Sequence, residues 1–230
     1  MDTQTTPTTP AMTTGRIDII SDAICPWCYI GKRQFERALP LLAADGLTFE
    51  VHWHAYQLNP DMPAEGVDRA EYRMKKFGSL ERTRQMDARV AEAGAAVGLD
   101  IRHDLMRRTP NTVAAHRTIW LAEQMGVQDA VVEALFRGFF TEGRDIGDTA
   151  TLIELAASAG LDAARVAAML AGAEGRDDVL GEDEMARRSG IDGVPSFTMR
   201  GHVLFSGAVP AETMAEAFAR AWRILSKQAA

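Results

Sequence analysis

The sequence has few cysteines and no long apolar run. Two of its 230 residues are cysteine, at positions 25 and 28. A structural zinc site needs four ligands, and the sequence has no second cysteine pair and no histidine pair separated by three to five residues. No apolar run approaches the roughly 20 residues of a membrane span. A zinc module and an integral membrane protein are therefore both disfavoured.

The charge is acidic and the N-terminus is polar. A net charge of −7 and the lack of a long basic run disfavour nucleic-acid binding. Residues 1–15 are rich in Thr and Pro and lack the basic and apolar regions of a signal peptide, so we expect a disordered leader. Without an export signal the expected compartment is the cytoplasm. Thiols there stay mostly reduced, so a disulfide would be catalytic or transient.

The two cysteines stand between an expected strand and an expected helix. The apolar run at 17–20 precedes them, and apolar residues recur at helical spacing over 29–42. Pro26 suits the first helical turn, and the positive end of the helix dipole favours a thiolate at Cys25. Cys28 lies one turn later on the same side. We therefore expect a redox pair in which Cys25 attacks and Cys28 resolves the mixed disulfide.

The rest of the pattern predicts two α/β segments that flank a helical block. The expected strands are 16–22, 47–55, 196–199 and 202–206, and the expected helices are 26–44, 68–77, 80–97, 112–125, 129–141, 149–159, 162–170, 177–189 and 210–225. The first two strands and their helix predict a parallel unit, and the last two strands an antiparallel hairpin. Long structureless connections are uncommon, so the middle of the chain is expected to fold as an insertion.

Five separated segments carry a resemblance to a known family. They are Ser21-Asp22-x-x-Cys25 through Arg33, Leu58 through Pro63, Asn111-Thr112-x-x-Ala115-His116-Arg117, Gly190-Ile191-x-Gly193-Val194-Pro195, and Ser206-Gly207-Ala208. On these segments the chain resembles the DsbA family, and within it the FrnE-type cytosolic branch. The resemblance implies an α/β, thioredoxin-like fold with a large all-helical insertion. It implies a thioredoxin-like domain formed by residues 16–60 and 176–230, interrupted by an insertion domain at 61–175.

The resemblance also implies a substrate groove. Pro195 would be a cis-proline facing the two cysteines, and the Val194 backbone would pair with an extended substrate segment. The implied substrate-binding residues are Pro26, Trp27, Asn111, His116, Val194 and Pro195. The residues by themselves leave simpler roles open: Pro195 could begin an edge strand, Asn111 could cap a helix, and His116 could be a packed side chain.

The sequence departs from the family pattern at two positions. Trp27 stands where the exported oxidant DsbA carries a histidine, and an indole cannot place a positive charge beside the thiolate. Ser196 follows Pro195 where relatives often carry an aromatic residue, so the rim of the groove is expected to differ. The direction of the redox reaction is therefore left open.

Three functions are compatible with this sequence. The leading one is a protein thiol–disulfide oxidoreductase that needs no metal and no organic cofactor. The second is a glutathione-linked transferase or isomerase on the same fold, which the second cysteine disfavours. The third is a non-catalytic, chaperone-like binding module. The expected partner is a protein with a thiol or disulfide, or a small thiol such as glutathione, and a homodimer is an open alternative.

Several other polar residues are assigned structural roles. Asp22 is expected at a solvated strand end, although a carboxylate there could also exchange protons with the thiols. His52 and His54 share a strand face, but no carboxylate partner for a metal pair is identifiable, so packing is the favoured role. The acidic run Glu182-Asp183-Glu184 is expected to face solvent.

Overall fold

The computed structural model describes residues 13–227. Strand β1 (Thr13–Ser21) begins three residues before the expected start at Arg16. The expected leader of residues 1–15 therefore overlaps the strand, and its first twelve residues lie outside the described part of the chain. Pairing with the neighbouring strand continues as far as Thr13, which holds this extension in the sheet.

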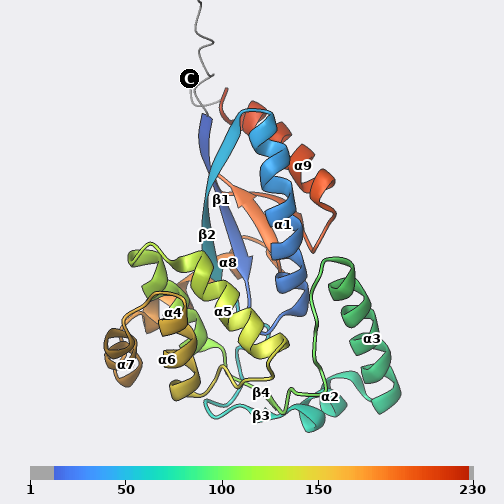
Figure 1. The fold of residues 1–230 in the computed structure, drawn as a ribbon, viewed down its shortest axis with the longest axis vertical. Helices are drawn as coiled ribbons and strands as arrows, with labels where there is room; N and C mark the ends of the chain where they lie inside the picture. The colour runs from blue at the N-terminus through green and yellow to red at the C-terminus, as the bar shows by residue number, and fades with distance from the viewer. Residues whose placement is uncertain (1–12, 228–230) are drawn as a thin grey trace, which may run out of the picture.

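A four-stranded mixed sheet lies at the centre of the molecule (Figure 1), in the order β2-β1-β5-β6. β1 pairs in parallel with β2 (Leu47–Ala55), and α1 (Pro26–Ala44) connects them. β5 (Ser196–Met199) is antiparallel to both β1 and β6 (His202–Ser206). The parallel unit and the hairpin expected from the sequence are both confirmed.

Helices dominate the segment between β2 and β5. They are α2 (Arg69–Phe77), α3 (Leu80–Ala96), α4 (Val113–Gln124), α5 (Gln128–Phe140), α6 (Thr149–Ser158), α7 (Ala163–Ala171) and α8 (Arg176–Arg188). Two short strands that the sequence analysis missed, β3 (Val67–Asp68) and β4 (Arg108–Thr109), pair with each other. Within residues 13–227, no helix is long and apolar enough to cross a membrane.

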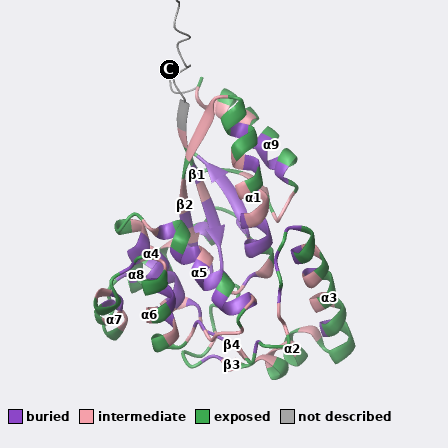
Figure 2. Ribbon diagram, in the orientation of Figure 1, coloured by how far each residue is buried: buried purple, intermediate pink, exposed green. Residues whose placement is uncertain are grey.

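The helical insertion surrounds the N-terminal end of α1. Figure 1 shows α2 and α3 on one side of this end and α4 to α7 on the other. β5 and the second half of β1 are largely buried and β2 is mostly intermediate, whereas α2 and α3 expose much of their surface (Figure 2). The insertion therefore places a thin helical wall on one side of the start of α1 and a thicker helical layer on the other.

An aromatic cluster joins the sheet to α1 and to the last helix, α9 (Ala211–Leu225). Phe218 of α9 is fully buried, and its ring centroid lies 5.7 Å from Phe35, 6.0 Å from Phe197 and 5.3 Å from Phe205. These residues come from α1, β5 and β6. Phe218 is therefore the point at which the two ends of the chain pack into one core.

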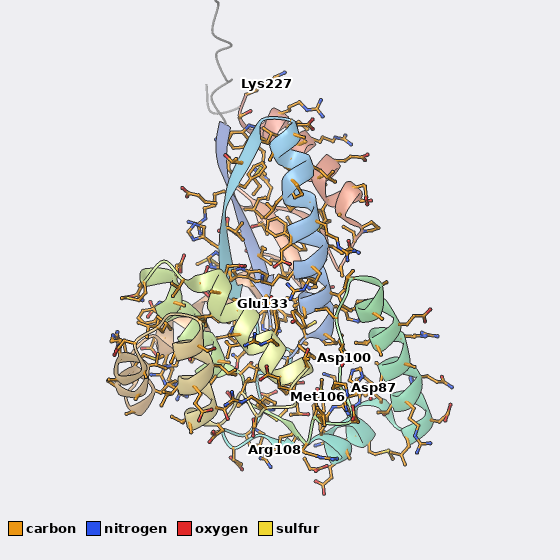
Figure 3. All side chains as sticks on the ribbon, viewed as in Figure 1. Asp87, Asp100, Met106, Arg108, Glu133 and Lys227 are labelled. Atoms are coloured by element: carbon orange, nitrogen blue, oxygen red, sulfur yellow. The ribbon has the colours of Figure 1, made fainter. Side chains whose placement is uncertain are left out.

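A buried cation joins α1 to the insertion. The Lys32 side chain is 2% exposed, and its ammonium lies 3.1 Å from Asp129 and 3.3 Å from Glu133 of α5, and also pairs with Glu36 (Glu133 is labelled in Figure 3). Burial alone would lower the pKa of Lys32, but the three carboxylates outweigh burial and raise it. A buried charge is tolerated where it is paired in this way.

The acidic run on α8 does not face solvent as a whole. Glu182 Oε2 accepts from the Ala55 amide at 2.8 Å, and Asp183 Oδ1 accepts from the Gln57 amide at 2.8 Å. Asp183 is buried, and of this run only Glu184 is exposed. The expectation was wrong because β2 lies at the edge of the sheet, where backbone N–H groups need acceptors from outside the sheet.

Both strand histidines have carboxylate partners that the sequence did not identify. His54 Nε2 lies 2.9 Å from Asp18 and its Nδ1 lies 2.9 Å from Glu182, while His52 Nδ1 lies 2.6 Å from Glu123. Burial lowers the pKa of His54, but the two carboxylates outweigh it and raise the pKa to about 9. No group of three potential ligands in residues 13–227 is placed to hold a metal ion. His54 therefore joins structural elements through ion pairs, and His52 joins β2 to α4 through its contact with Glu123.

We predict that Phe218→Ala lowers the free energy of unfolding by about 3–5 kcal/mol, because it opens a cavity in the buried aromatic cluster. Urea unfolding followed by circular dichroism measures the loss. The matched control is Ile224→Ala on the same helix, where a half-exposed side chain is removed and the change should stay within about 0.5 kcal/mol. Equal losses in the two variants would contradict the assignment.

We predict that His54→Gln destabilises the protein near neutral pH and much less in alkali. The folded pKa of about 9 exceeds the usual 6.5, so the stabilisation is complete below the lower value and disappears as the pH rises through the higher one. The shift corresponds to roughly 3 kcal/mol. Urea unfolding of wild type and variant at about pH 6 and about pH 10 measures it. A difference between the two proteins that does not change with pH would refute the pairing.

Candidate active site

The N-terminus of α1 places both cysteines. Cys25 is the N-cap residue and Pro26 occupies the first turn. The Cys25 amide donates to Asp22 O at 3.0 Å, and the Cys25 carbonyl accepts from the Cys28 amide at 3.0 Å. A tight turn thus carries the chain from β1 directly into the helix. Both cysteines are free thiols.

The two thiols differ in accessibility. Cys28 is completely buried, and burial together with the neighbouring Cys25 raises the pKa of its thiol well above the usual value. Cys25 is 4% exposed but lines a cavity at the protein surface, and Cys28 does not line it. A substrate can therefore reach Cys25 first, while Cys28 lies behind it as a protonated thiol.

The segment around Pro195 lies against the start of α1. The Val194–Pro195 peptide bond is cis, the configuration that the resemblance implies, and Cys25 Sγ lies 3.5 Å from Val194 O. A Cβ added to Gly31 would lie 2.9 Å from Pro195 Cγ, closer than real side chains approach. Glycine at position 31 therefore permits α1 to lie this close to Pro195.

The residue after Pro195 does not form the rim of the groove. Ser196 is fully buried, and its Oγ donates to Gly193 O at 2.7 Å and lies 2.6 Å from Ser206 Oγ. The Pro195 carbonyl accepts from the Gly207 amide at 2.7 Å. These bonds tie the segment to the following strand, so Ser196 has a positioning role that the sequence analysis did not foresee.

A cavity of about 320 Å³ opens beside Cys25. Four of the expected site residues line it: Cys25, Pro26, Trp27 and Val194. The helical wall on its far side and the connection after α3 add residues that the sequence analysis did not single out: Arg69, Tyr72, Arg73, Lys76 and Asp87 from the helices, and His103 from the connection. Asp87 and Met106, both labelled in Figure 3, lie close together on this side. No motif marks the residues of α2, whose charges are those of an ordinary solvated helix.

Four expected site residues are absent from the lining of this cavity: Cys28 and Pro195, whose contacts are described above, and Asn111 and His116. Asn111 Oδ1 accepts from the Val113 amide at 3.0 Å, and its Nδ2 donates to Met62 O at 2.7 Å, so Asn111 caps α4 and fixes a loop. His116 is buried, with Nε2 3.2 Å from Tyr56 O. Both therefore hold the loop region around the cavity and do not form its wall.

The structure corrects the expected position of Asp22. Its side chain is fully buried and not solvated, because Oδ2 accepts from the Leu58 amide at 2.7 Å and Oδ1 lies 3.4 Å from His116 Nε2. The turn before Cys25 and the loop at Leu58 converge on this carboxylate. The burial depends on tertiary contacts with Leu58 and His116, which a strand-end position does not reveal.

The arrangement of the thiols, the cis-proline segment and the helical insertion agrees with the comparisons. A family model, the DSBA-like thioredoxin domain, matches residues 16–219. The chain belongs to the DsbA-like thioredoxin family. It has the thioredoxin-like fold with a helical insertion, and the family places it among the disulfide oxidoreductases.

Individual relatives of this DsbA-like protein agree with the assignment. A probable DsbA oxidoreductase from Streptomyces coelicolor is 36% identical, with a TM-score of 0.82 and 90% coverage of both chains. Cytosolic disulfide reductase DsbM from Pseudomonas aeruginosa, solved with GSH, shares the fold at 17% identity and a TM-score of 0.57, covering 93% of this chain and 98% of its own. YwbO of Bacillus subtilis, which is uncharacterised, is 27% identical over 66% of this chain and 69% of its own length.

We predict that Gly31→Ala lowers both the stability and the activity of this DsbA-like protein. The added methyl group pushes α1 away from Pro195, which costs about 1–3 kcal/mol of unfolding free energy and displaces Cys25 from Val194. Urea unfolding and the rate of disulfide reduction measure the two effects.

The control for this variant is Gly181→Ala on α8, where an added Cβ meets nothing within 4 Å. There the same substitution should stabilise the helix by about 0.5–1 kcal/mol and leave the reduction rate unchanged. Wild-type stability and rate in Gly31→Ala would show that the close approach to Pro195 is unimportant.

Proposed function

We propose that this protein is a thiol–disulfide oxidoreductase of the FrnE-type branch, with Cys25 and Cys28 as its redox pair. One observation carries the proposal: Cys25 caps α1 at the edge of a cavity, 3.5 Å from Val194 O, with Cys28 buried behind it. In this arrangement an extended substrate segment pairs with the Val194 backbone and brings its sulfur to Cys25. Because the resemblance is to a cytosolic branch, the proposal includes a cytoplasmic location.

The helix N-terminus supports attack by Cys25. The helix dipole and the N–H groups of the first turn of α1 favour the negative charge that an attacking sulfur carries at this position. The Cys25 thiolate attacks one sulfur of a substrate disulfide, forms a mixed disulfide and releases the other sulfur as a thiolate, which takes up a proton.

Resolution requires the buried thiol. Cys28 loses its proton and attacks Cys25 Sγ, which forms the intramolecular disulfide and releases the second substrate sulfur. The substrate disulfide is reduced to two thiols and the pair is oxidised to one disulfide, so two electrons are transferred. The raised pKa of Cys28 keeps its proton in place until Cys25 has reacted.

We predict that Cys25→Ser abolishes dithiothreitol-driven reduction of insulin, measured as the turbidity of the precipitating B chain. Cys28→Ser should retain the first attack and accumulate a mixed disulfide on a non-reducing gel, because nothing resolves it. Unfolding curves of both variants serve as the control for folding.

The alternatives give different outcomes in the same assays. Undiminished activity of Cys25→Ser would refute the proposal. Turnover with glutathione that survives Cys28→Ser would instead indicate a glutathione-linked transferase. Suppression of client aggregation by the double Cys→Ser variant, with no reductase activity in the wild type, would indicate a chaperone-like module.

A further inference from the structure

One wall of the cavity beside Cys25 is built from cations. Arg69 and Arg73 lie one turn apart on α2, and both guanidinium groups bind a single carboxylate of α3: Asp87 Oδ1 lies 3.1 Å from Arg69 and 2.7 Å from Arg73. Two positive charges therefore share one negative charge at the surface of the cavity.

The other charged groups that face the cavity do not restore the balance. Lys76 adds a third cation one turn further along α2, where its ammonium donates to Asn59 Oδ1 at 3.1 Å. Burial lowers the pKa of His103, which lies 3.6 Å from Asp87, so the imidazole is neutral near pH 7 and leaves the charge balance unchanged. Among the lining residues in the described chain, the balance is thus three cations against the single carboxylate of Asp87.

Arg73 has an unmet hydrogen-bond donor. Its Nε is buried and has no hydrogen-bond partner among the described residues, although Nη2 donates to Thr83 O at 3.2 Å. Burial and the neighbouring Arg69 lower the pKa of Arg73 despite the pairing with Asp87. Buried donors are normally satisfied, so the unpaired Nε marks an incompletely satisfied guanidinium, and an anion bound in the cavity would supply the missing charge.

The rest of the lining suits the apolar part of a small molecule. Phe77, Met86, Val90 and Met106 give the cavity an apolar surface between α2 and Cys25. Its volume of about 320 Å³ lies in the range of small-molecule sites. A ligand that presents sulfur to Cys25 and a carboxylate to α2 would match both parts of this lining.

We propose that the cavity selects small thiols that carry a carboxylate, in their disulfide form, with Arg69, Arg73 and Lys76 binding the carboxylate while the sulfur reaches Cys25. This inference rests on the proposed function and adds a substrate class to it. Guanidinium groups bind carboxylates through paired hydrogen bonds, which also orient the attached disulfide.

The chemistry follows the same exchange. The Cys25 thiolate breaks the S–S bond of the acidic disulfide, forms a mixed disulfide with one half and releases the other half as a thiolate. Cys28 then displaces the first half, so that one acidic disulfide gives two acidic thiols and the oxidised pair. Dithiothreitol regenerates the dithiol in the assay.

The test uses three disulfides of similar length and different charge: dithiodipropionate, its neutral diamide and cationic cystamine. We predict that wild type reduces the dianion with a kcat/KM about tenfold above the diamide, and cystamine most slowly. Arg73→Gln should lower the kcat/KM for the dianion about tenfold. Lys76→Gln, at a more exposed position, should lower the kcat/KM for the dianion about threefold. Each variant should lower the diamide rate much less than it lowers the dianion rate.

The matched control is Arg84→Gln, which makes the same charge change at an exposed position of α3 that does not line the cavity, and should leave all three rates unchanged. Added salt should lower only the dianion rate. Because Arg73 also bonds to Thr83, the folding of the Arg73→Gln variant is checked by circular dichroism. If this variant is unfolded, Lys76→Gln and the salt series test the inference in its place.

Equal wild-type rates for the dianion and the diamide, or equal losses for both in the variants, would overturn the inference. Insulin reduction separates it from the proposed function: an unchanged insulin rate with no charge preference refutes only the acidic substrate class. If the wild type reduces no disulfide, the proposed function fails. In that case calorimetry measures the binding of dithiodipropionate to the double Cys→Ser variant. Binding that disappears when Arg73→Gln is added would still support the anion site, and no binding would refute it.

Discussion

The site depends on the close packing of the first turns of α1 against the Val194–Pro195 segment. Gly31 leaves no room for a Cβ beside Pro195, and the Val194 carbonyl lies 3.5 Å from Cys25 Sγ. This contact joins residues about 170 positions apart in sequence. In the proposed mechanism a substrate reaches the sulfur and the backbone of Val194 together, so any change that separates the two segments alters both halves of the site at once.

The helical insertion supports this contact from two sides. On one side, buried Lys32 pairs with Asp129 and Glu133 and so holds α1 against α5. On the other side, α2 and α3 add a charged wall that faces Cys25. The first side holds the start of α1 in position, and in the proposed mechanism the second side selects what approaches Cys25. An insertion outside the thioredoxin-like core can in this way bear on selectivity without contributing either cysteine.

Much of the fold could be predicted because it depends on local patterns. Apolar periodicity places the strands and helices, and the three-residue spacing of Cys25 and Cys28 puts both thiols on one side of a helix start. Burial of polar groups was harder. Asp22, Glu182 and Asp183 look like surface carboxylates in sequence, yet each accepts a backbone N–H from a distant segment. Periodicity does not reveal which segment brings that donor.

The sequence by itself determined that both cysteines stand at the start of a helix, and it determined the order of the helices and of the four strands in the main sheet; the family motifs predicted that the Val194-Pro195 segment faces the cysteines. Each of these follows from neighbours in the chain or from motif residues. Only the tertiary structure decided that Asn111 and His116 lie outside the cavity wall and that Arg69, Arg73 and Lys76 form it. The reason is physical: a charged helix face has the same sequence pattern whether solvent or an active-site cavity lies against it.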